Sequence, residues 1–555
     1  MSDRWKQYWP WAVLVAVTVA VYVRVPEFGL MVGWDDELYL LRRPEVVDWF
    51  GASWWQRLAT PSLGYPVPLP TFVHYLVRQL PADWVLPFNH LVNLAFHLTN
   101  VCLAYLLARR WLDDERAALA CTALWAAHPL LVESVAWLAN LKGLMFATSA
   151  LASIWLWERH LDEPSWGRST AIAGAFVVAL GCRPDAIVLG PIWIGQTLLR
   201  DPARLHDPRR WGPLAVAVVG SAAYLPIAVA GQQAVVASEN LGSGLNVGFG
   251  ERLRRIFSGL TLQLEHAVYP LGLQPDYPAD YPGAARDAWI GVGLFVLLIA
   301  ATVGSWRRAG TSDRGWLVWW MFYAPVSGLV VLPRFTADAY MYLPLFGLLV
   351  AAVGGVSRVL SRSEVRVRRG LKRASVVGLV AALGLAAHVQ TLRWRNIVAL
   401  WRPVMRAQPS NIKAKWMVAS GYVRAEAYEK ALAIYRPAYS AFVAAGRIPF
   451  RMVVALERTG RHRRAVEVAA RMMTYEGKTS SEVERFLVRT VVEHELSVEP
   501  GGALAPVLGR AAETVLEEKG GFEAAFCRRA VEHFADEGLA DLARRFRRCS
   551  APASP

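Results

Sequence analysis

Long apolar runs fill most of residues 1–391. A helix crosses the hydrocarbon core of a bilayer with about 17 to 25 such residues. The stretch from Ala117 to Trp157 is too long for one span, and we divide it at His128-Pro129, because proline lacks the amide that a continuous helix would use. The sequence therefore predicts an all-α, polytopic membrane bundle over residues 1–391. Its eleven predicted spans lie at about 9–25, 88–108, 117–130, 143–158, 169–183, 185–200, 212–231, 287–305, 315–332, 338–357 and 374–391.

Lysine and arginine collect in alternate short connections, which sets the expected orientation. The positive-inside rule makes that side cytoplasmic, together with the N-terminus that bears Arg4 and Lys6. We therefore expect a multi-pass protein of the inner (cytoplasmic) membrane, with Asp35-Asp36 and everything after Arg393 outside. These loops explain most of the formal charge of +15, which argues against nucleic-acid binding. The basic connections contain Arg109, Arg110 and Arg116; Arg200, Arg204, Arg209 and Arg210; Arg307, Arg308 and Arg314; and Arg358 to Arg373 with Arg362, Arg366, Arg368, Arg369 and Lys372 between.

The chain changes character at about Leu392, and no later run is long enough to span. Two similar segments begin at Tyr428 and His462, and their Ala431 and Ala465 are 34 residues apart, the period of the tetratricopeptide helical hairpin. We predict tetratricopeptide-like repeats over 392–477 and further helical hairpins over 478–555 that cap the array. Plain amphipathic helices of accidental phase are the alternative.

The five cysteines fall into two groups. Cys102, Cys121 and Cys182 sit in apolar spans and are interpreted as core residues. Cys527 lies about ten residues before an expected turn near Glu537-Gly538 and Cys549 about eleven after it, so antiparallel helices would bring them together. Because an oxidising compartment permits a disulfide, we predict that Cys527 and Cys549 are bonded. Neither spacing nor histidine partners suggest a zinc site.

An acidic pair, Asp35-Asp36, follows the first predicted span at the start of the outer loop 26–87. Carboxylates fixed at the edge of a bilayer can act as bases on a lipid-borne substrate. Helix capping and simple solvation are the alternatives. The same loop carries Trp54-Trp55 and the proline-rich Pro61 to Pro70. Its aromatic rings suit either anchoring at the lipid interface or stacking on a sugar.

A second outer segment runs from His128 to Lys142. Glu133, Trp137 and Asn140 share one helical face in it. An ionisable group within a span costs roughly 2.5 to 3.5 kcal/mol on insertion scales, so one at its border usually has a partner or a function. We take His128, Glu133 and Lys142 as candidate substrate-binding residues. A structural salt link from Glu133 to Lys142, or to an arginine elsewhere, is the alternative.

The remaining candidates lie on other outer segments. The basic face of the loop 232–286 would hold a lipid phosphate or lie on anionic headgroups, and arginine suits phosphate geometry. The candidates are Arg183 and Asp185 between the fifth and sixth spans, Arg254, Arg255 and Tyr277 in the loop, and Arg334, Asp338 and Tyr342 around the start of the tenth span.

Several motifs follow one another in an order that resembles a known family. They are Trp34-Asp35-Asp36; His128-Pro129 with Val132-Glu133-Ser134-Val135-Ala136-Trp137; Ala337-Asp338 with Tyr340, Tyr342, Leu343 and Pro344; and Trp394-Arg395-Asn396, Leu400-Trp401, Pro409 and Asn411. Over nearly its whole length the chain resembles a bacterial relative of the transmembrane and tetratricopeptide-repeat O-mannosyltransferases, which are GT-C class glycosyltransferases. Relatives usually carry a basic residue at 141, an acidic one at 143 and an arginine at 339, where this chain has Leu141, Gly143 and Ala339.

The resemblance implies inverting transfer of a mannose-like hexose from a polyprenyl-phosphate donor to an acceptor hydroxyl on a protein, at the outer face. Asp35 would be the general base and Asp36 a supporting or metal-binding carboxylate, or the reverse. Outer arginines would neutralise the departing phosphate. No cofactor is implied, although paired carboxylates suit a divalent metal ion. The repeats would grip the acceptor polypeptide or a protein partner.

Two other classes of protein remain open. A non-catalytic, membrane-anchored repeat scaffold for an extracytoplasmic complex would explain the tail and the missing charges, but not the gathering of Asp35-Asp36, Glu133, Arg183 and Asp338 on one side. A lipid-sugar transporter would place charges at mid-span rather than at the outer rim.

Overall fold

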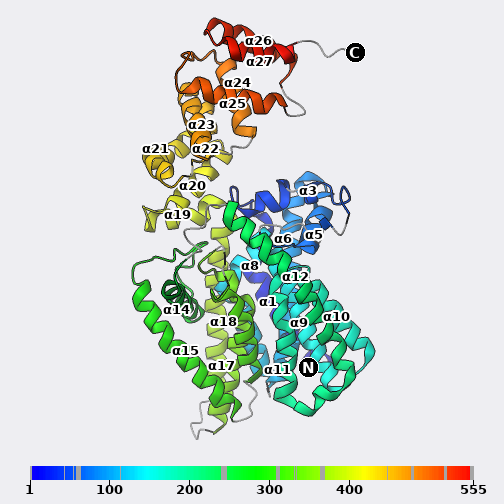
Figure 1. Ribbon diagram of the computed structural model, residues 1–555. Coiled ribbons are helices and arrows are strands. Elements are labelled where there is room, and N and C mark those ends of the chain that lie inside the picture. The colour runs from blue at the N-terminus through cyan, green and yellow to red at the C-terminus, as the bar shows by residue number, and fades with distance from the viewer. Residues whose placement is uncertain are drawn as a thin grey trace. The chain divides into compact units, whose positions relative to one another are not determined.

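The computed structural model describes residues 3–42, 44–53, 56–57, 64–112, 114–238, 247–307, 313–330, 332, 334–362, 369–446, 448–476, 481–517 and 522–550. The regular elements in these ranges are helices, as Figure 1 shows. The chain divides into two compact units, Met1–Leu400 and Trp401–Pro555. Among the residues singled out above, the described ranges do not include Trp54, Trp55, Pro61, Arg308, Arg366 and Arg368.

The first unit contains both long helices and short interrupted ones. Its α-helices are α1 (Asp3–Tyr22), α2 (Asp35–Glu37), α3 (Pro44–Val47), α5 (Pro68–Arg78), α6 (Ala82–Trp111), α7 (Glu115–Ala126), α8 (Val132–Ala136), α9 (Leu141–Asp162), α10 (Trp166–Leu180), α11 (Leu189–Arg200), α12 (Trp211–Ser238), α14 (Phe249–Val268), α15 (Ala284–Trp306), α16 (Asp313–Tyr323), α17 (Tyr342–Arg362) and α18 (Arg369–Thr391). The single-turn elements that matter below are η3 (Pro129–Leu131), η4 (Leu138–Asn140), η5 (Pro184–Val188), η7 (Pro208–Arg210) and η9 (Asp338–Met341). Helix α19 (Ile397–Ala407) crosses the boundary between the units.

Six helical segments in the described part of the chain are long and apolar enough to cross a membrane, which makes this a multi-pass membrane protein. They are Tyr8–Glu27, Ala82–Trp111, Pro208–Gly231, Ala284–Trp306, Asp338–Arg358 and Ala374–Arg395. Helix α7 with η3 and α8 would make a seventh, bent by 53° at the predicted His128-Pro129 break. Helices α9, α10, α11 and α16 occupy the other four predicted positions, but α10, α11 and α16 are shorter and α9 carries Lys142 and Glu158 within it.

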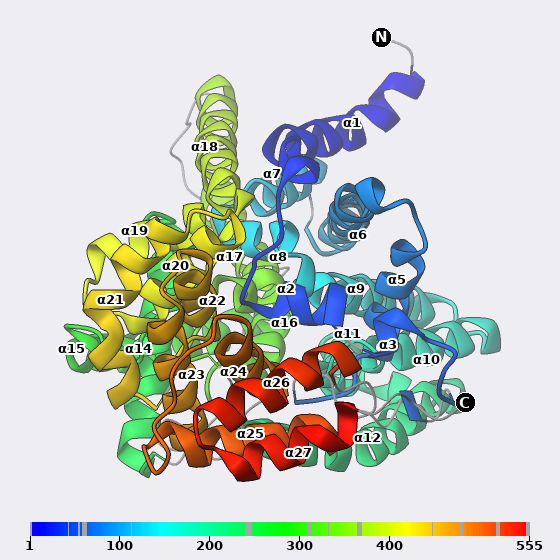
Figure 2. The same ribbon diagram turned by 90° about the horizontal axis from the view of Figure 1, so that it is seen from above.

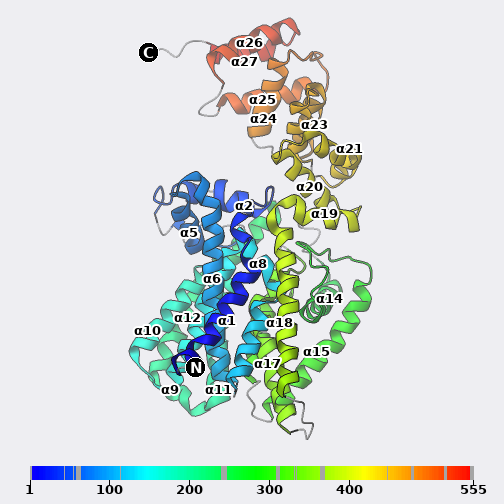
Figure 3. The same ribbon diagram turned by 180° about the vertical axis from the view of Figure 1, so that it is seen from behind.

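The long helices of the first unit pack side by side. Helix α6 packs on α7 and α9, α9 packs on α10, and α10 packs on α12. Figure 2, viewed from above, shows this group on one side and the pair α14 and α15 on the other. Helix α1 packs against α6, α7 and α18, as Figure 3 shows from behind. This arrangement surrounds the interrupted segment between α7 and α9.

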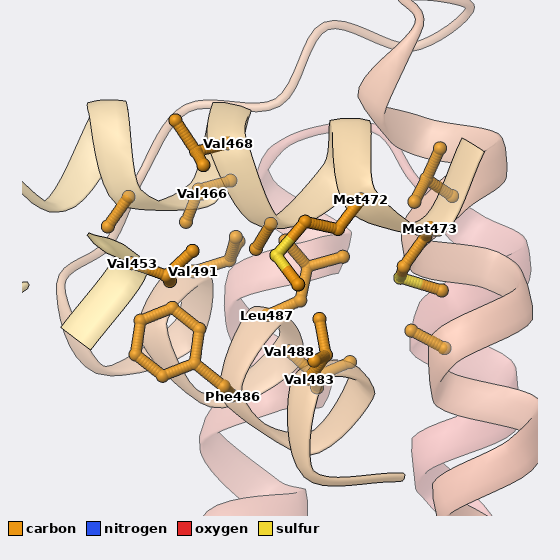
Figure 4. Packing of buried hydrophobic residues seen from close by; sticks show 14 of the residues in the cluster. Val453, Val466, Val468, Met472, Met473, Val483, Phe486, Leu487, Val488 and Val491 are labelled. Atoms are coloured by element: carbon orange, nitrogen blue, oxygen red, sulfur yellow. The ribbon is translucent and has the colours of Figure 1, made fainter. Parts of the chain in front are cut away.

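The second unit is a succession of helix pairs. Helix α20 (Ile412–Arg424) packs on α21 (Tyr428–Ala444), α22 (Phe450–Arg458) on α23 (His462–Glu476), α24 (Ser481–Glu493) on α25 (Leu504–Glu517) and α26 (Ala524–Asp536) on α27 (Ala540–Ser550). Each interface is apolar: Val453 on α22, Val466 and Met472 on α23, and Leu487 on α24 interdigitate in Figure 4. The unit therefore has a continuous core of its own.

The last helix pair is closed by a covalent bond. Gly538 adopts φ of +72° in the turn between α26 and α27, a conformation that side chains with a Cβ rarely take. The tight turn makes the helices antiparallel, and Cys527 and Cys549 form a disulfide with 5.8 Å between their Cα atoms.

Candidate functional site

An interrupted helical segment, residues 128–142, forms the centre of the site. His128 accepts the amide hydrogen of Leu130 through Nδ1 at 3.2 Å and so caps η3. Its Nε2 lies 3.1 Å from the carbonyl oxygen of Ala267 on α14. His128, predicted to bind substrate, is thus engaged on both ring nitrogens in holding the break in place.

Glu133 forms a buried ion pair with a residue far away in the sequence. Its Oε1 lies 2.6 Å from Nη1 of Arg334, and its Oε2 accepts the amide hydrogen of Ala339 at 3.2 Å. Arg334 also donates to the carbonyl oxygen of Pro275 at 2.9 Å and lies 5.3 Å from the ring centroid of Trp137. Of the alternatives given for Glu133, the structure shows the salt bridge to a distant arginine, Arg334. Arg334 therefore braces the segment.

Lys142 takes no part in that ion pair. Its Nζ donates to the hydroxyl of Tyr39 at 3.0 Å and lies over the rings of Tyr39 and Tyr65, at 4.6 and 5.7 Å from their centroids. Lys142 therefore ties the start of α9 to the residues that follow the acidic pair.

The two residues of the acidic pair differ in their surroundings. Asp36 is buried, with Oδ2 accepting the amide hydrogen of Met31 at 3.0 Å and Oδ1 that of Ala139 at 2.9 Å. Burial raises the pKa of Asp36 to about 7, against the lowering effect of these two bonds. Asp35 is half-buried at the start of α2. Asp36 thus fixes the loop to the interrupted segment, and Asp35 is the member within reach of solvent.

Tryptophan stacking reinforces the same junction. The ring of Trp34 stacks on that of Trp137 with 4.6 Å between centroids, and on that of Trp394 with 6.1 Å. The residue just before the acidic pair is therefore held by the segment 128–142 and by the turn that follows α18.

A small pocket, here called the Arg183 pocket, opens beside this segment. It is lined by Ser134, Asn140, Gly143, Phe146, Arg183, Asp185, Phe322, Val326, Ala339, Tyr340, Tyr342, Leu343 and Pro344. Arg183 pairs with Asp185 at 2.6 Å. Within the described part of the chain, Nε of Arg183 and Oγ of Ser134 are buried and have no hydrogen-bond partner. Two buried donors that lack an acceptor suit an anionic ligand.

Two positions at which the chain departs from the resembling family line this pocket. A Cβ on Gly143 would lie 2.8 Å from Oδ1 of Asn140, so any side chain at 143 would displace that amide. Ala339 has no charge to offer, and its amide hydrogen is held by Glu133. The pocket is therefore shaped around Asn140 and Arg183.

The other predicted residues lie around the pocket or apart from it. Tyr342 lines it and its hydroxyl bonds His97 and Asn100 on α6, at 2.7 and 3.1 Å. Tyr277 donates to Oδ1 of Asp338 at 2.8 Å. Burial and the Asp338 charge raise the pKa of Tyr277 well above its usual range, so it remains a phenol.

Arg254 and Arg255 are not brought to the pocket. Both bond Glu251 on their own helix, α14, at 2.5 and 2.6 Å, and Arg254 also pairs with Asp280 at 2.6 Å. Their charges are largely compensated, which weakens the prediction that they bind a donor phosphate.

One face of α6 supports the site and was not predicted from the sequence. Nδ2 of Asn93 donates to the carbonyl oxygens of Val135 and Trp137, at 3.2 and 3.1 Å, where α8 ends. Backbone groups of an interrupted helix need such partners at membrane depth. The available signal was a set of polar residues within one apolar run, namely Asn89, His90, Asn93, His97 and Asn100, all buried.

No group of three or more His, Cys, Asp or Glu side chains in the described ranges could hold a metal ion.

No family model matches the chain. Over 98 residues the chain is 33% identical to the protein O-mannosyl-transferase Tmtc1 of Drosophila melanogaster. That stretch is 18% of this chain and 11% of the relative, so the chain spans about a tenth of the protein it matches. The chain is thus a multi-span helical membrane protein with partial similarity to an O-mannosyltransferase.

Proposed function

We propose that the chain is a membrane glycosyltransferase that moves a mannose-like hexose from a polyprenyl-phosphate donor to an acceptor hydroxyl on a protein. The partial similarity to an O-mannosyltransferase supports the class of reaction. Paired carboxylates and a buried arginine with a free donor supply the two functions that such a transfer needs.

One observation carries the proposal. Asp36 accepts the amide hydrogen of Ala139, and the next residue, Asn140, lines the Arg183 pocket. A single short segment therefore connects the acidic pair to the pocket that Arg183 lines. A base and a phosphate-binding pocket fixed to the same segment are held in register, which is the geometric requirement for transfer between two bound substrates.

The roles follow from the different surroundings of these residues. The acceptor oxygen attacks the anomeric carbon and its proton passes to Asp35, while the bond from that carbon to the phosphate oxygen breaks. Arg183 stabilises the charge on the departing lipid phosphate. Asp36 positions Asp35, and the pair of Glu133 with Arg334 holds the pocket wall. Attack from the side opposite the leaving group inverts the anomeric centre.

The topology belongs to the same proposal. Counting α9, α10, α11 and α16 and the bent segment as spans gives eleven, and the positive-inside rule then puts Asp35 and the second unit at the outer face of the cytoplasmic membrane. The pairs α20–α21 and α22–α23, whose second helices begin at Tyr428 and His462, support tetratricopeptide-like repeats. These repeats would hold the acceptor polypeptide or a protein partner.

The test is transfer from a radiolabelled polyprenyl-phosphate hexose to extracytoplasmic protein by the purified chain. Asp35→Asn should lower the rate by about 100-fold or more, the usual size of a general-base contribution. Arg183→Gln should chiefly lower kcat, because the charge that Arg183 stabilises develops as the bond to the phosphate breaks. The matched control is Asp83→Asn, which removes an exposed carboxylate at the start of α6. Unchanged transfer in the Asp35 and Asp36 single and double variants would contradict the assignment.

A second candidate is a non-catalytic, membrane-anchored scaffold. It is favoured by Gly143 and Ala339, which leave the pocket without two charges that the resembling family carries. If an in vivo phenotype survives Asp35→Asn, Asp36→Asn and Arg183→Gln but is lost on deletion of residues 411–555, the scaffold is the better account.

A further inference from the structure

A buried arginine lies away from the candidate site, where α9 and α10 meet the start of α12. Arg210 is only 3% exposed, and its Nη1 donates to the carbonyl oxygen of Arg204. Its Nε is buried with no hydrogen-bond partner, and it forms no ion pair with a carboxylate in the described ranges. Buried charges in proteins are almost always paired, so this guanidinium points to a missing anion.

The acidic residues near Arg210 already form ion pairs with other arginines. Arg168 pairs with Glu163 at 2.7 Å, Arg204 with Asp201 at 3.4 Å and Arg209 with Asp207 at 3.0 Å. Each acid in this group therefore already faces its own arginine. The group as a whole keeps one uncompensated positive charge, which Arg210 carries.

His160, at the end of α9, adds a second unsatisfied donor. Its Nδ1 accepts the amide hydrogen of Ser165 at 3.4 Å, so in the neutral ring the proton sits on Nε2. That Nε2 is buried and has no partner among the described residues. The pKa of His160 is lowered to about 4, chiefly by burial, with Arg210, Arg168 and Arg209 acting in the same direction and Asp207 opposing them. A neutral His160 therefore offers an N–H group that needs an acceptor.

The residues around Arg210 and His160 favour a lipid headgroup as the anion that accepts their hydrogen bonds. Arg210 lies at the start of the candidate span Pro208–Gly231. Trp166 and Trp211, at the starts of α10 and α12, are 65% and 62% exposed, as expected of tryptophans at a bilayer interface. Helices α10 and α12 pack together and continue from there with exposed valines, such as Val178 and Val218, that suit acyl chains.

We propose that His160 and Arg210, with the three paired arginines around them, bind the phosphate of an anionic phospholipid headgroup. The phosphodiester oxygens accept from Nε of Arg210 and Nε2 of His160. The single negative charge of the lipid matches the single unpaired positive charge. This site is independent of the transfer reaction proposed above, since none of its residues lines the Arg183 pocket.

The experiment uses the purified full chain, delipidated in detergent, and follows its melting temperature on addition of phosphatidylglycerol, phosphatidylcholine or inorganic phosphate. A ligand that binds only the folded state raises the melting temperature. Phosphatidylglycerol should stabilise the wild type by several degrees and the other two should not. Arg210→Gln should weaken the lipid dependence at least tenfold. Arg116→Gln, which removes an exposed arginine at the start of α7, should leave it unchanged.

Each other outcome counts against a lipid site. Equal stabilisation of wild type and Arg210→Gln, or stabilisation by phosphatidylcholine alike, would overturn it, and an effect of inorganic phosphate alone would replace the lipid with a free anion. If Arg210→Gln does not fold, native mass spectrometry of the wild type decides. It should retain one anionic phospholipid per chain after mild delipidation, and retention of none would overturn the proposal.

Discussion

Glu158 is the side chain whose loss should destabilise the first unit most clearly. Its carboxylate is 1% exposed and contacts three other helices from α9. Oε1 accepts from Nε1 of Trp111 at 3.0 Å and from Nε of Arg314 at 3.0 Å, and Oε2 accepts from Nε of Arg110 at 3.2 Å. Gln196 on α11 donates to Oε1 at 3.2 Å. One charged group thus joins α6, α9, α11 and α16.

We expect Glu158→Gln to lower the free energy of unfolding by about 3 to 5 kcal/mol, the usual cost of removing one partner from a buried ion pair. Glutamine has nearly the same shape, but its amide nitrogen would face arginine or tryptophan donors and leave their hydrogens without an acceptor. The control is Glu163→Gln, whose side chain is 73% exposed and pairs with Arg168 at the surface. That variant should lose less than about 1 kcal/mol.

The assay is equilibrium unfolding of the full chain in mixed micelles, followed by tryptophan fluorescence and compared with melting temperature. Similar losses in the two variants would show that the carboxylate is not the junction described here. A normal melting temperature for Glu158→Gln would refute the argument outright.

Three further predictions concern charge, covalent closure and topology. The pKa of Asp36 is about 7 in the folded chain against an ordinary 3.8, so the proton stabilises the fold at low pH and this contribution, up to about 4 kcal/mol, is lost as pH rises from 4 to 7. The difference in stability between wild type and Asp36→Asn, measured across that range, should follow this curve, and a flat difference would contradict it. Reducing the bond between Cys527 and Cys549 should cost the second unit about 2 to 4 kcal/mol in denaturant melts, whereas two reactive thiols in the unreduced protein would show that the bond is absent. A reporter fused after Arg369 should be cytoplasmic and one fused after Pro555 extracytoplasmic, and the same side for both would disprove the proposed span count.

Features with a local cause could be predicted from the sequence, although one such feature argues against the predicted basic phosphate-binding face. The break at His128-Pro129 follows from the missing proline amide, and the chain bends by 53° there. The neutralisation of Arg254 and Arg255 was equally local, since Glu251 lies three and four positions before them on the same helix. That spacing was available in the sequence and argued against a free basic face.

Long-range pairing could not be read in the same way. Lys142 is the cation closest to Glu133 in sequence, yet the pair forms with Arg334, 201 positions away, because the backbone turns between α8 and α9. The distinction between Asp35 and Asp36 likewise depends on Ala139, whose amide meets only one of the two carboxylates. The count of eleven spans stays a prediction, since α10, α11 and α16 occupy predicted spans but are shorter than the helices that are long and apolar enough to cross a membrane.

The most direct test of the proposed function is the rate of hexose transfer from a polyprenyl-phosphate donor by the wild type and by Asp35→Asn. Asparagine keeps the size and hydrogen-bonding capacity of aspartate but cannot accept the proton, so folding should be preserved and the rate should fall by about 100-fold or more. Full transfer by the Asp35→Asn variant, with the same membrane level as the wild type, would contradict the account.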